Sequence, residues 1–266
     1  MDSPEFVFTS LHPSEEPNPA TPYVPRARYC IYRGMWGELP DNKHNEASMN
    51  DRVYESDLLT FTSDVRMSKI PEVFASSRGH GEVSQSQGSG GGGPVEAVFW
   101  VKDVMTQWRF RGEAYVVGQD VEGAGSDSSG VSTMKHKIGE RMRVVEEAGK
   151  KDWSWKKELT AHFGNLNPTM RGSFKNPAPG SRVSIPPSDK SLAPGQKVTD
   201  LEDEVARRNF RVVIIRPDEV EQLDLTEPDK ARRWKFTYVG GGSGGGEHAG
   251  QPGDTIGEWK KEELWP

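Results

Sequence analysis

The sequence is poor in the residues that build disulfides, membrane spans and large apolar cores. Its 266 residues include a single cysteine, Cys30, which excludes an intramolecular disulfide and cannot build a thiolate metal site alone. No apolar run approaches the ~20 residues that a membrane-spanning helix needs, and Met1-Asp2-Ser3 does not open a signal peptide. With 33% hydrophobic residues and a mean hydropathy of -0.74, much of the chain cannot be core. We therefore expect a soluble, cytoplasmic protein with one domain over residues 1–266 and long polar insertions.

Positive charge and metal-ligand patterns are also scarce. The net charge is -6 and the isoelectric point about 5.6, which argues against a general nucleic-acid binder. None of the six histidines is spaced with another histidine, a cysteine or a carboxylate as metal ligands are. We therefore expect no metal site. His162 lies in a predicted helix, where a surface position or a satisfied interior role is favoured over catalysis.

Glycine and proline are abundant, and they mark three polar segments. Residues 79–94 and 240–253 are rich in glycine and lack the apolar content that offsets ordering entropy, so we expect flexible insertions. A phosphate-cradling loop is the alternative, but neither segment ends in the Gly-Lys-Ser/Thr of a P-loop. Residues 175–197 contain five prolines and should cross the surface in an extended conformation.

Strand patterns dominate the rest of the chain. Segments rich in β-branched and aromatic residues predict strands at Phe6–Ser10, Ala27–Arg33, Leu58–Ser63, Val95–Lys102, Gln107–Gly118, Phe210–Arg216 and Arg233–Val239. Apolar spacings of three and four predict a helix over Val131–Ala148, and further helices are expected at Trp153–Phe163, Asp200–Arg208 and, as one turn, Ile70–Ser76. This order favours an antiparallel β-barrel with helical additions over an alternating βαβ sheet.

Basic side chains stand beside hydroxyl groups near two predicted strands. Arg28 opens one cluster, and Arg66 and Lys69 follow Thr62-Ser63 and flank Ser68 in another. A phosphate dianion is held by this mixture of cationic and neutral donors. Arg28 and Arg33 are five residues apart, so a regular strand sends them to opposite faces. We predict that only Arg28 of these two faces the phosphate.

Four motifs in order resemble the pyridoxamine 5'-phosphate oxidase family, and most closely its divergent branch of FMN-binding domains. Arg28-Tyr29-Cys30-Ile31-Tyr32-Arg33 is similar to the family's Arg-x-Val-Leu-Leu-Lys strand, and Thr62 to Lys69 is similar to Thr-Asp-x-Arg-Ser-x-Lys. Gln107 to Gly112 resembles Arg-Gln-Val-Arg-x-x-Gly, and Arg232 to Phe236 with the terminal Trp259…Leu264-Trp265-Pro266 resembles the family's C-terminal motifs. The resemblance covers residues 5–118 and 165–266.

The resemblance implies a mainly β, six- or seven-stranded antiparallel split β-barrel that binds FMN and has a few peripheral helices. It implies a homodimer with each cofactor site at the subunit interface. Arg28, Arg66 and Lys69 would hold the FMN phosphate, Gln107 would reach the flavin from the partner subunit, and Arg233 would face the polar edge of the ring. The full set of cofactor-binding residues implied is Arg28, Tyr29, Cys30, Ile31, Arg33, Phe61, Thr62, Arg66, Ser68, Lys69, Gln107 and Arg233.

The sequence departs from the family where the oxidases bind their substrate. Asp229-Lys230-Ala231 stands where they have Arg-Leu-His, and Leu223 stands where they have a tryptophan over the flavin. The helix that precedes the family's first strand is not evident before Phe6, which points to a short form or an incomplete gene model. We therefore predict a flavin-dependent oxidoreductase of unassigned substrate and catalytic residues, not a pyridoxal phosphate producer. The alternatives are a flavin-binding protein without turnover and a barrel that has lost FMN and serves as an interaction module.

Overall fold

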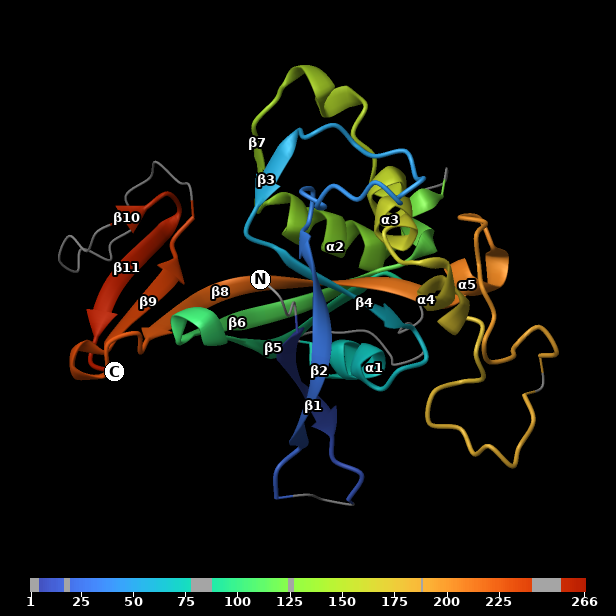
Figure 1. Cartoon of the computed structure of the whole chain (residues 1–266), viewed down its shortest axis with the longest axis horizontal. Helices are drawn as coiled ribbons and strands as arrows, with labels where there is room; N and C mark the ends of the chain where they lie inside the picture. The colour runs from blue at the N-terminus through green and yellow to red at the C-terminus, as the bar shows by residue number, and fades with distance from the viewer. Residues whose placement is uncertain (1–4, 17–19, 78–87, 124–126, 188, 241–254) are drawn as a thin grey trace.

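A long antiparallel sheet that closes partly into a ring is the centre of the computed structural model (Figure 1). The structure describes residues 5–16, 20–77, 88–123, 127–187, 189–240 and 255–266. The strands are β1 (Glu5–Pro13), β2 (Tyr23–Met35), β3 (Tyr54–Ser56), β4 (Leu59–Asp64), β5 (Gly90–Val101), β6 (Thr106–Val117), β7 (Met142–Val144), β8 (Phe210–Asp224), β9 (Arg232–Tyr238), β10 (Thr255–Ile256) and β11 (Trp259–Leu264). The α-helices are α1 (Lys69–Ala75), α2 (Ser129–Gly139), α3 (Trp155–Gly164), α4 (Pro168–Ser173) and α5 (Glu204–Asn209).

The ring closes through β8, which is 15 residues long. Its first half pairs with β4 and with the end of β6, and its second half pairs with the start of β6 and with β9. The order around the ring is β8-β4-β2-β1-β5-β6, and β6 returns to β8. Strands β9, β11 and β10 extend the sheet beyond the ring (Figure 1). The expected antiparallel split barrel with few helices is confirmed.

Two apolar cores lie on opposite faces of β8. Val213 and Ile215 pack inside the ring with Phe6, Phe8, Phe61 and Phe99, whereas Phe210, Val212 and Ile214 pack outward against α2 and α3. Alternate residues of a strand point to opposite faces, so a strand buried on both faces has a continuous apolar run. The run Val212-Val213-Ile214-Ile215 is such a sequence.

Helix boundaries differ from the predicted ones at two places. The helix expected over Val131–Ala148 ends at Gly139, and Met142 starts β7, which pairs with β3. The apolar residues Met142 and Val145 continued the helical spacing by chance, because a short strand gives no periodicity that would distinguish it. Helix α5 begins after Asp203, whose carboxylate accepts a hydrogen bond from the Ala206 amide, rather than at Asp200. None of the described helices has the length and apolarity to span a membrane.

The glycine-rich segment 79–94 is not flexible over its last five residues, which begin β5. Residues 78–87 lie outside the described residues, but Gly90 to Pro94 pair with β6 across a bulge between Gly91 and Gly93. A Cβ on Gly93 would lie 2.4 Å from both the Val73 carbonyl oxygen and the Ser76 Oγ. Glycine is therefore required because the strand passes directly against α1. Of the expected insertion 240–253, only Gly240 is described, and the described residues of 175–197 form turns without helix or strand.

His162 lies in the outer core between α3 and the sheet. It is 1% exposed, and its ring stacks on Trp36 with centroids 5.4 Å apart. In the described structure neither ring nitrogen has a hydrogen-bond partner, and Glu158 Oε1 lies 3.7 Å from Nε2. Burial, followed by the charge of Arg33, lowers the pKa of His162 from 6.5 to about 3. The interior position is as expected, but the imidazole is not satisfied by hydrogen bonds.

His162 should make the protein sensitive to acid. The unfolded chain binds a proton near pH 6.5 and the folded chain only near pH 3, so the stabilisation is complete above pH 6.5 and is lost as the pH falls toward 3. We expect the free energy of unfolding of the wild type to fall more steeply over this interval than that of His162→Phe, by an amount on the order of 1.4 kcal/mol per pH unit at most. Urea denaturation at several pH values measures it, and parallel pH profiles would contradict a neutral buried imidazole.

Candidate functional site

The ring has an open seam between β2 and β4. Within the described residues these strands pair at Met35–Leu59 and Tyr32–Phe61, and the recorded ladder does not continue to residues 29–31. On its other side β2 pairs with β1 along its first nine residues. A strand edge that lacks a neighbour presents free N–H and C=O groups. The predicted ligand-binding residues of β2 and β4 therefore flank an edge that can accept a ligand.

Lys69 supplies a buried ammonium beside this seam. It is the first residue of α1 and is 7% exposed, and in the described part of the chain its ammonium has one hydrogen-bond partner, Ser63 Oγ at 3.4 Å. Burial is the main cause that lowers the pKa of Lys69, and Arg28 contributes to the same effect. Burial also raises the pKa of the neighbouring Cys30 thiol, so this thiol does not supply the missing negative charge. A lysine this buried ordinarily has an anionic partner.

Arg28 lies near Lys69 but is already paired. Its guanidinium donates to Glu72 Oε2 at 2.7 Å and to Ser10 Oγ at 2.5 Å, and it lies over the Phe8 ring. Glu72 is on α1, one turn after Lys69, and is 2% exposed. The pair brings β1, β2 and α1 together at one end of the seam. Its charges cancel, so Arg28 adds little net positive charge there.

Arg66 points to a different set of partners. It makes a two-pronged bond to the Asp64 carboxylate, at 2.8 and 2.6 Å, and also donates to the carbonyl oxygens of Phe174 and Asn176. These contacts fasten the segment after α4 to the turn after β4. The phosphate role of Arg66 stays a prediction, but its donors are largely used by the protein itself.

The remaining residues of β2 and β4 face different ways. Tyr29 is 77% exposed, whereas Cys30 and Phe61 point into the ring core, so these two can contact a ligand only through their backbone. Arg33 acts on His162 in the outer core, so it lies on the face opposite Arg28, as the five-residue spacing predicts. Ile31 and Thr62 are half-buried, and Ser68 is exposed and makes no capping bond to α1.

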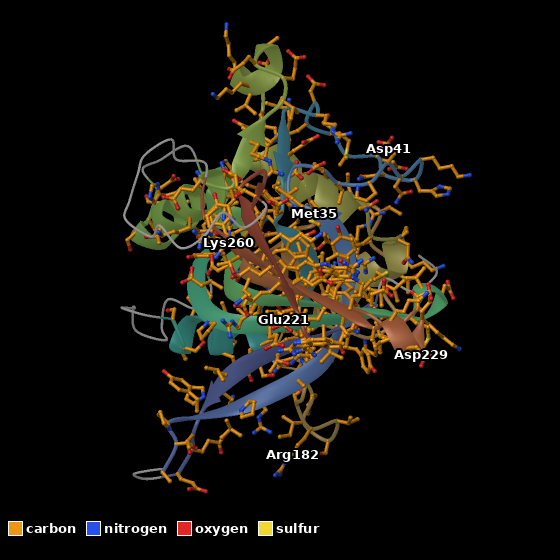
Figure 2. All side chains as sticks on the ribbon, turned by 90° about the vertical axis from the view of Figure 1, so that its left-hand side faces the viewer. Met35, Asp41, Arg182, Glu221, Asp229 and Lys260 are labelled. Atoms are coloured by element: carbon orange, nitrogen blue, oxygen red, sulfur yellow. The ribbon has the colours of Figure 1, made fainter. Side chains whose placement is uncertain are left out.

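Lys69 and Arg28, with their partners Ser63, Glu72 and Ser10, form the basic cluster. Within one chain, Gln107 and Arg233 lie outside this cluster. Gln107 pairs in register with Leu223 of β8, and Leu223 pairs with Arg233 of β9. This row lies toward the β9–β11 end of the sheet, whereas α1, which begins at Lys69, lies below its centre (Figure 1). Asp229 is on the exposed turn between β8 and β9, away from Met35 of β2 (Figure 2).

An apolar hollow of about 250 Å³ adjoins the paired part of the seam. Its lining is almost entirely aromatic and aliphatic: Tyr32, Met35, Leu59, Phe99, Val101, Trp108 and Phe110. Tyr32, Met35 and Leu59 belong to the two pairs formed between β2 and β4, so the hollow lies along the paired part of the seam. A larger hollow of about 750 Å³, at the start of β5 and α2, includes none of the residues around Lys69.

Two residues near Lys69 and Arg28 were not predicted, namely Glu72 and Ser10. Ser63 was expected among the hydroxyl groups beside the cations, although not in the set of cofactor-binding residues. Glu72 stands three residues after Lys69, a helical spacing that places both on one face. Ser10 has no local signal, because only the pairing of β1 with β2 brings it to Arg28.

The ring, its seam and the buried Lys69 define a split-barrel protein. Residues 2–118 match the family described as pyridoxamine 5'-phosphate oxidase, FMN-binding domain, so the similarity to this family lies in that segment. It includes β1 to β6 and every residue of the basic cluster.

Solved structures resemble the chain over its whole length. A pyridoxamine 5'-phosphate oxidase-related, FMN binding protein from Nostoc punctiforme PCC 73102 is 15% identical, with a TM-score of 0.50 over 99% of this chain and 88% of that protein. PhzG from Burkholderia lata 383, solved in complex with tetrahydrophenazine-1-carboxylic acid, is 11% identical, with a TM-score of 0.38 over 99% and 83%. The first similarity shows a shared fold. No protein of curated function matches the sequence.

Proposed function

We propose that the chain binds FMN at the seam between β2 and β4, with Lys69 and Ser63 at the phosphate. The observation that carries this proposal is the buried Lys69 ammonium, whose hydrogen-bond partner among the described residues is a hydroxyl 3.4 Å away. A phosphate oxygen would give this ammonium the charge-assisted bond that it lacks in the protein alone. The match of residues 2–118 to an FMN-binding family supports the choice of phosphate over other anions.

The flavin ring fits the other part of the seam. A planar heterocycle with polar edges can bond to those backbone groups of residues 29–31 that point away from β1, and its apolar face can approach the hollow near Tyr32. Arg28 and Tyr32 are four residues apart, so at a rise of about 3.3 Å per residue their Cα atoms are separated by roughly 13 Å. This span suits a ligand with a charged tail and a ring at its other end.

Lys69→Met should weaken FMN binding at least tenfold, about 1.4 kcal/mol, because methionine keeps the length of the side chain and removes its charge. Quenching of flavin fluorescence on titration measures the dissociation constant. Lys135→Met is the matched control, since Lys135 lies on α2, outside the seam, and pairs there with Asp127. Equal FMN affinity in Lys69→Met and the wild type would show that the phosphate is not held by Lys69.

We also propose that the protein is an oxidoreductase, on the strength of its similarity to this family. Bound FMN supplies the ability to accept and release a hydride, and the chain supplies binding and orientation. Residues 229–231, which stand where the oxidases bind the phosphate of their substrate, lack a free side-chain donor for that group. Asp229 is exposed, Lys230 is paired with Glu227 at 2.6 Å, and Ala231 has no donor in its side chain. This observation favours a second candidate, a flavin-binding protein without turnover.

Anaerobic titration of the flavin-loaded protein separates these two candidates. We expect amines or nicotinamide nucleotides to bleach the oxidised flavin, and pyridoxamine 5'-phosphate to bleach it least, because no free cation is available at residues 229–231 to bind its phosphate. Visible absorption under nitrogen is the measurement, and free FMN with the same donors is the control. If no donor reduces bound FMN faster than free FMN, the binding protein without turnover is the better description.

We propose further that two copies form the complete site. Gln107 and Arg233 lie in one row with Leu223, away from Lys69 of the same chain. Large apolar side chains are exposed toward this end of the sheet, among them Trp100 and the 94% exposed Trp265. A symmetric dimer would both cover such residues and bring Gln107 of one chain to the flavin held by the other.

Complementation between two variants tests the shared site. Lys69→Met and Gln107→Ala should each weaken FMN binding in their own homodimers. In a heterodimer of the two, purified through a different tag on each chain, one site contains both substitutions and the other contains neither. We expect FMN titration to recover one site of wild-type affinity per heterodimer. A heterodimer without any wild-type site would show that Lys69 and Gln107 act from the same chain.

A further inference from the structure

Glu72 places a buried carboxylate at the phosphate end of the proposed site. It bonds to Arg28 at 2.7 Å and lies 3.1 Å from His12 Nδ1, and it also accepts from the Ser10 hydroxyl. These partners come from β1 and β2, and Glu72 itself is 2% exposed on α1. An anion at Lys69 would therefore bind close to an existing negative charge.

The charges near the seam form two neutral pairs and one remaining cation. Glu72 neutralises Arg28 and Asp64 neutralises Arg66, while Lys69 has no carboxylate within ion-pair distance among the described residues. A phosphate that drew Arg28 away would leave Glu72 buried without its counter-charge, which is strongly unfavourable. A phosphate that left Arg28 in place would bind beside the Glu72 carboxylate and be repelled by it.

We propose that Glu72 competes with the flavin phosphate for Arg28 and thereby limits how strongly the protein prefers FMN over unphosphorylated riboflavin. The inference rests on the proposed FMN site and deepens it. The ring and ribityl chain are common to both flavins, so the ratio of their dissociation constants isolates the phosphate. Glu72 is then a specificity-determining residue that acts through Arg28.

A double-mutant cycle on Arg28 and Glu72 tests this role. Glu72→Gln keeps the shape of the side chain and removes its charge, and we expect it to raise the preference for FMN over riboflavin at least about fivefold. Arg28→Gln leaves Glu72 unpaired beside the phosphate and should lower the preference. The double variant removes both charges and should return it to within about threefold of the wild type. Fluorescence titration with each flavin gives the dissociation constants.

The outcomes separate this inference from the proposed function. If riboflavin and FMN bind but Glu72→Gln leaves the preference unchanged or lowers it, Glu72 only orients Arg28 and the competition is refuted. If neither flavin binds the wild type, the FMN site itself is refuted, and the competition with it. Should Glu72→Gln fail to fold, the double variant decides: a tenfold fall in FMN preference would mark Arg28 as a free phosphate ligand. Glu219→Gln, which removes the half-buried carboxylate paired with the exposed Arg111, is the matched control.

Discussion

β2 and β4 pair at Tyr32–Phe61, and the ladder recorded between them does not extend to residues 29–31 of β2. Residues 29–31 pair with β1 on their other side, so the backbone groups left at this edge are those of the alternate residues that point toward β4. α1 follows β4 after a short turn and places Lys69 beside the open part. The opening of the ring therefore sets both the place and the polarity of the candidate site.

Two ion pairs lie near the seam, and beside them lies Lys69, which has no carboxylate within ion-pair distance among the described residues. The pair Arg28–Glu72 joins β2 to α1. Arg66 pairs with Asp64 two residues away, and its bonds to the carbonyl oxygens of Phe174 and Asn176 join the turn after β4 to the segment after α4. Lys69 is different, because burial is the main cause that lowers its pKa, and the charges of Glu72 and Asp64 oppose this effect only in part. A buried charge without a partner is unfavourable for stability, so its presence is better explained by ligand binding than by folding.

Strands and local motifs could be predicted from the sequence, whereas the residues that each side chain contacts could not. β-branched and aromatic residues predicted strands at Gln107–Gly118 and Phe210–Arg216, which correspond to β6 and to the first half of β8. The extent of β5 into Gly90 to Pro94 was missed, because the glycine content reads as flexibility until the close approach of α1 is known. Arg66 was grouped with Lys69 from proximity in sequence, yet its carbonyl partners lie about 110 residues further along the chain.

The C-terminal strands fix the far row of the site independently of the seam. Arg141 lies over the Tyr238 ring, and Trp259 donates to Asp57, so β9 and β11 are held against the body near β3. Arg233 takes its place in register between Leu223 and Leu264. β8 connects the two ends of the sheet, because its first half pairs with β4, which leads into α1, and its second half pairs with β9, which carries Arg233. A strand of 15 residues separates these ends, so Lys69 and Arg233 of one chain are held apart by the sheet itself.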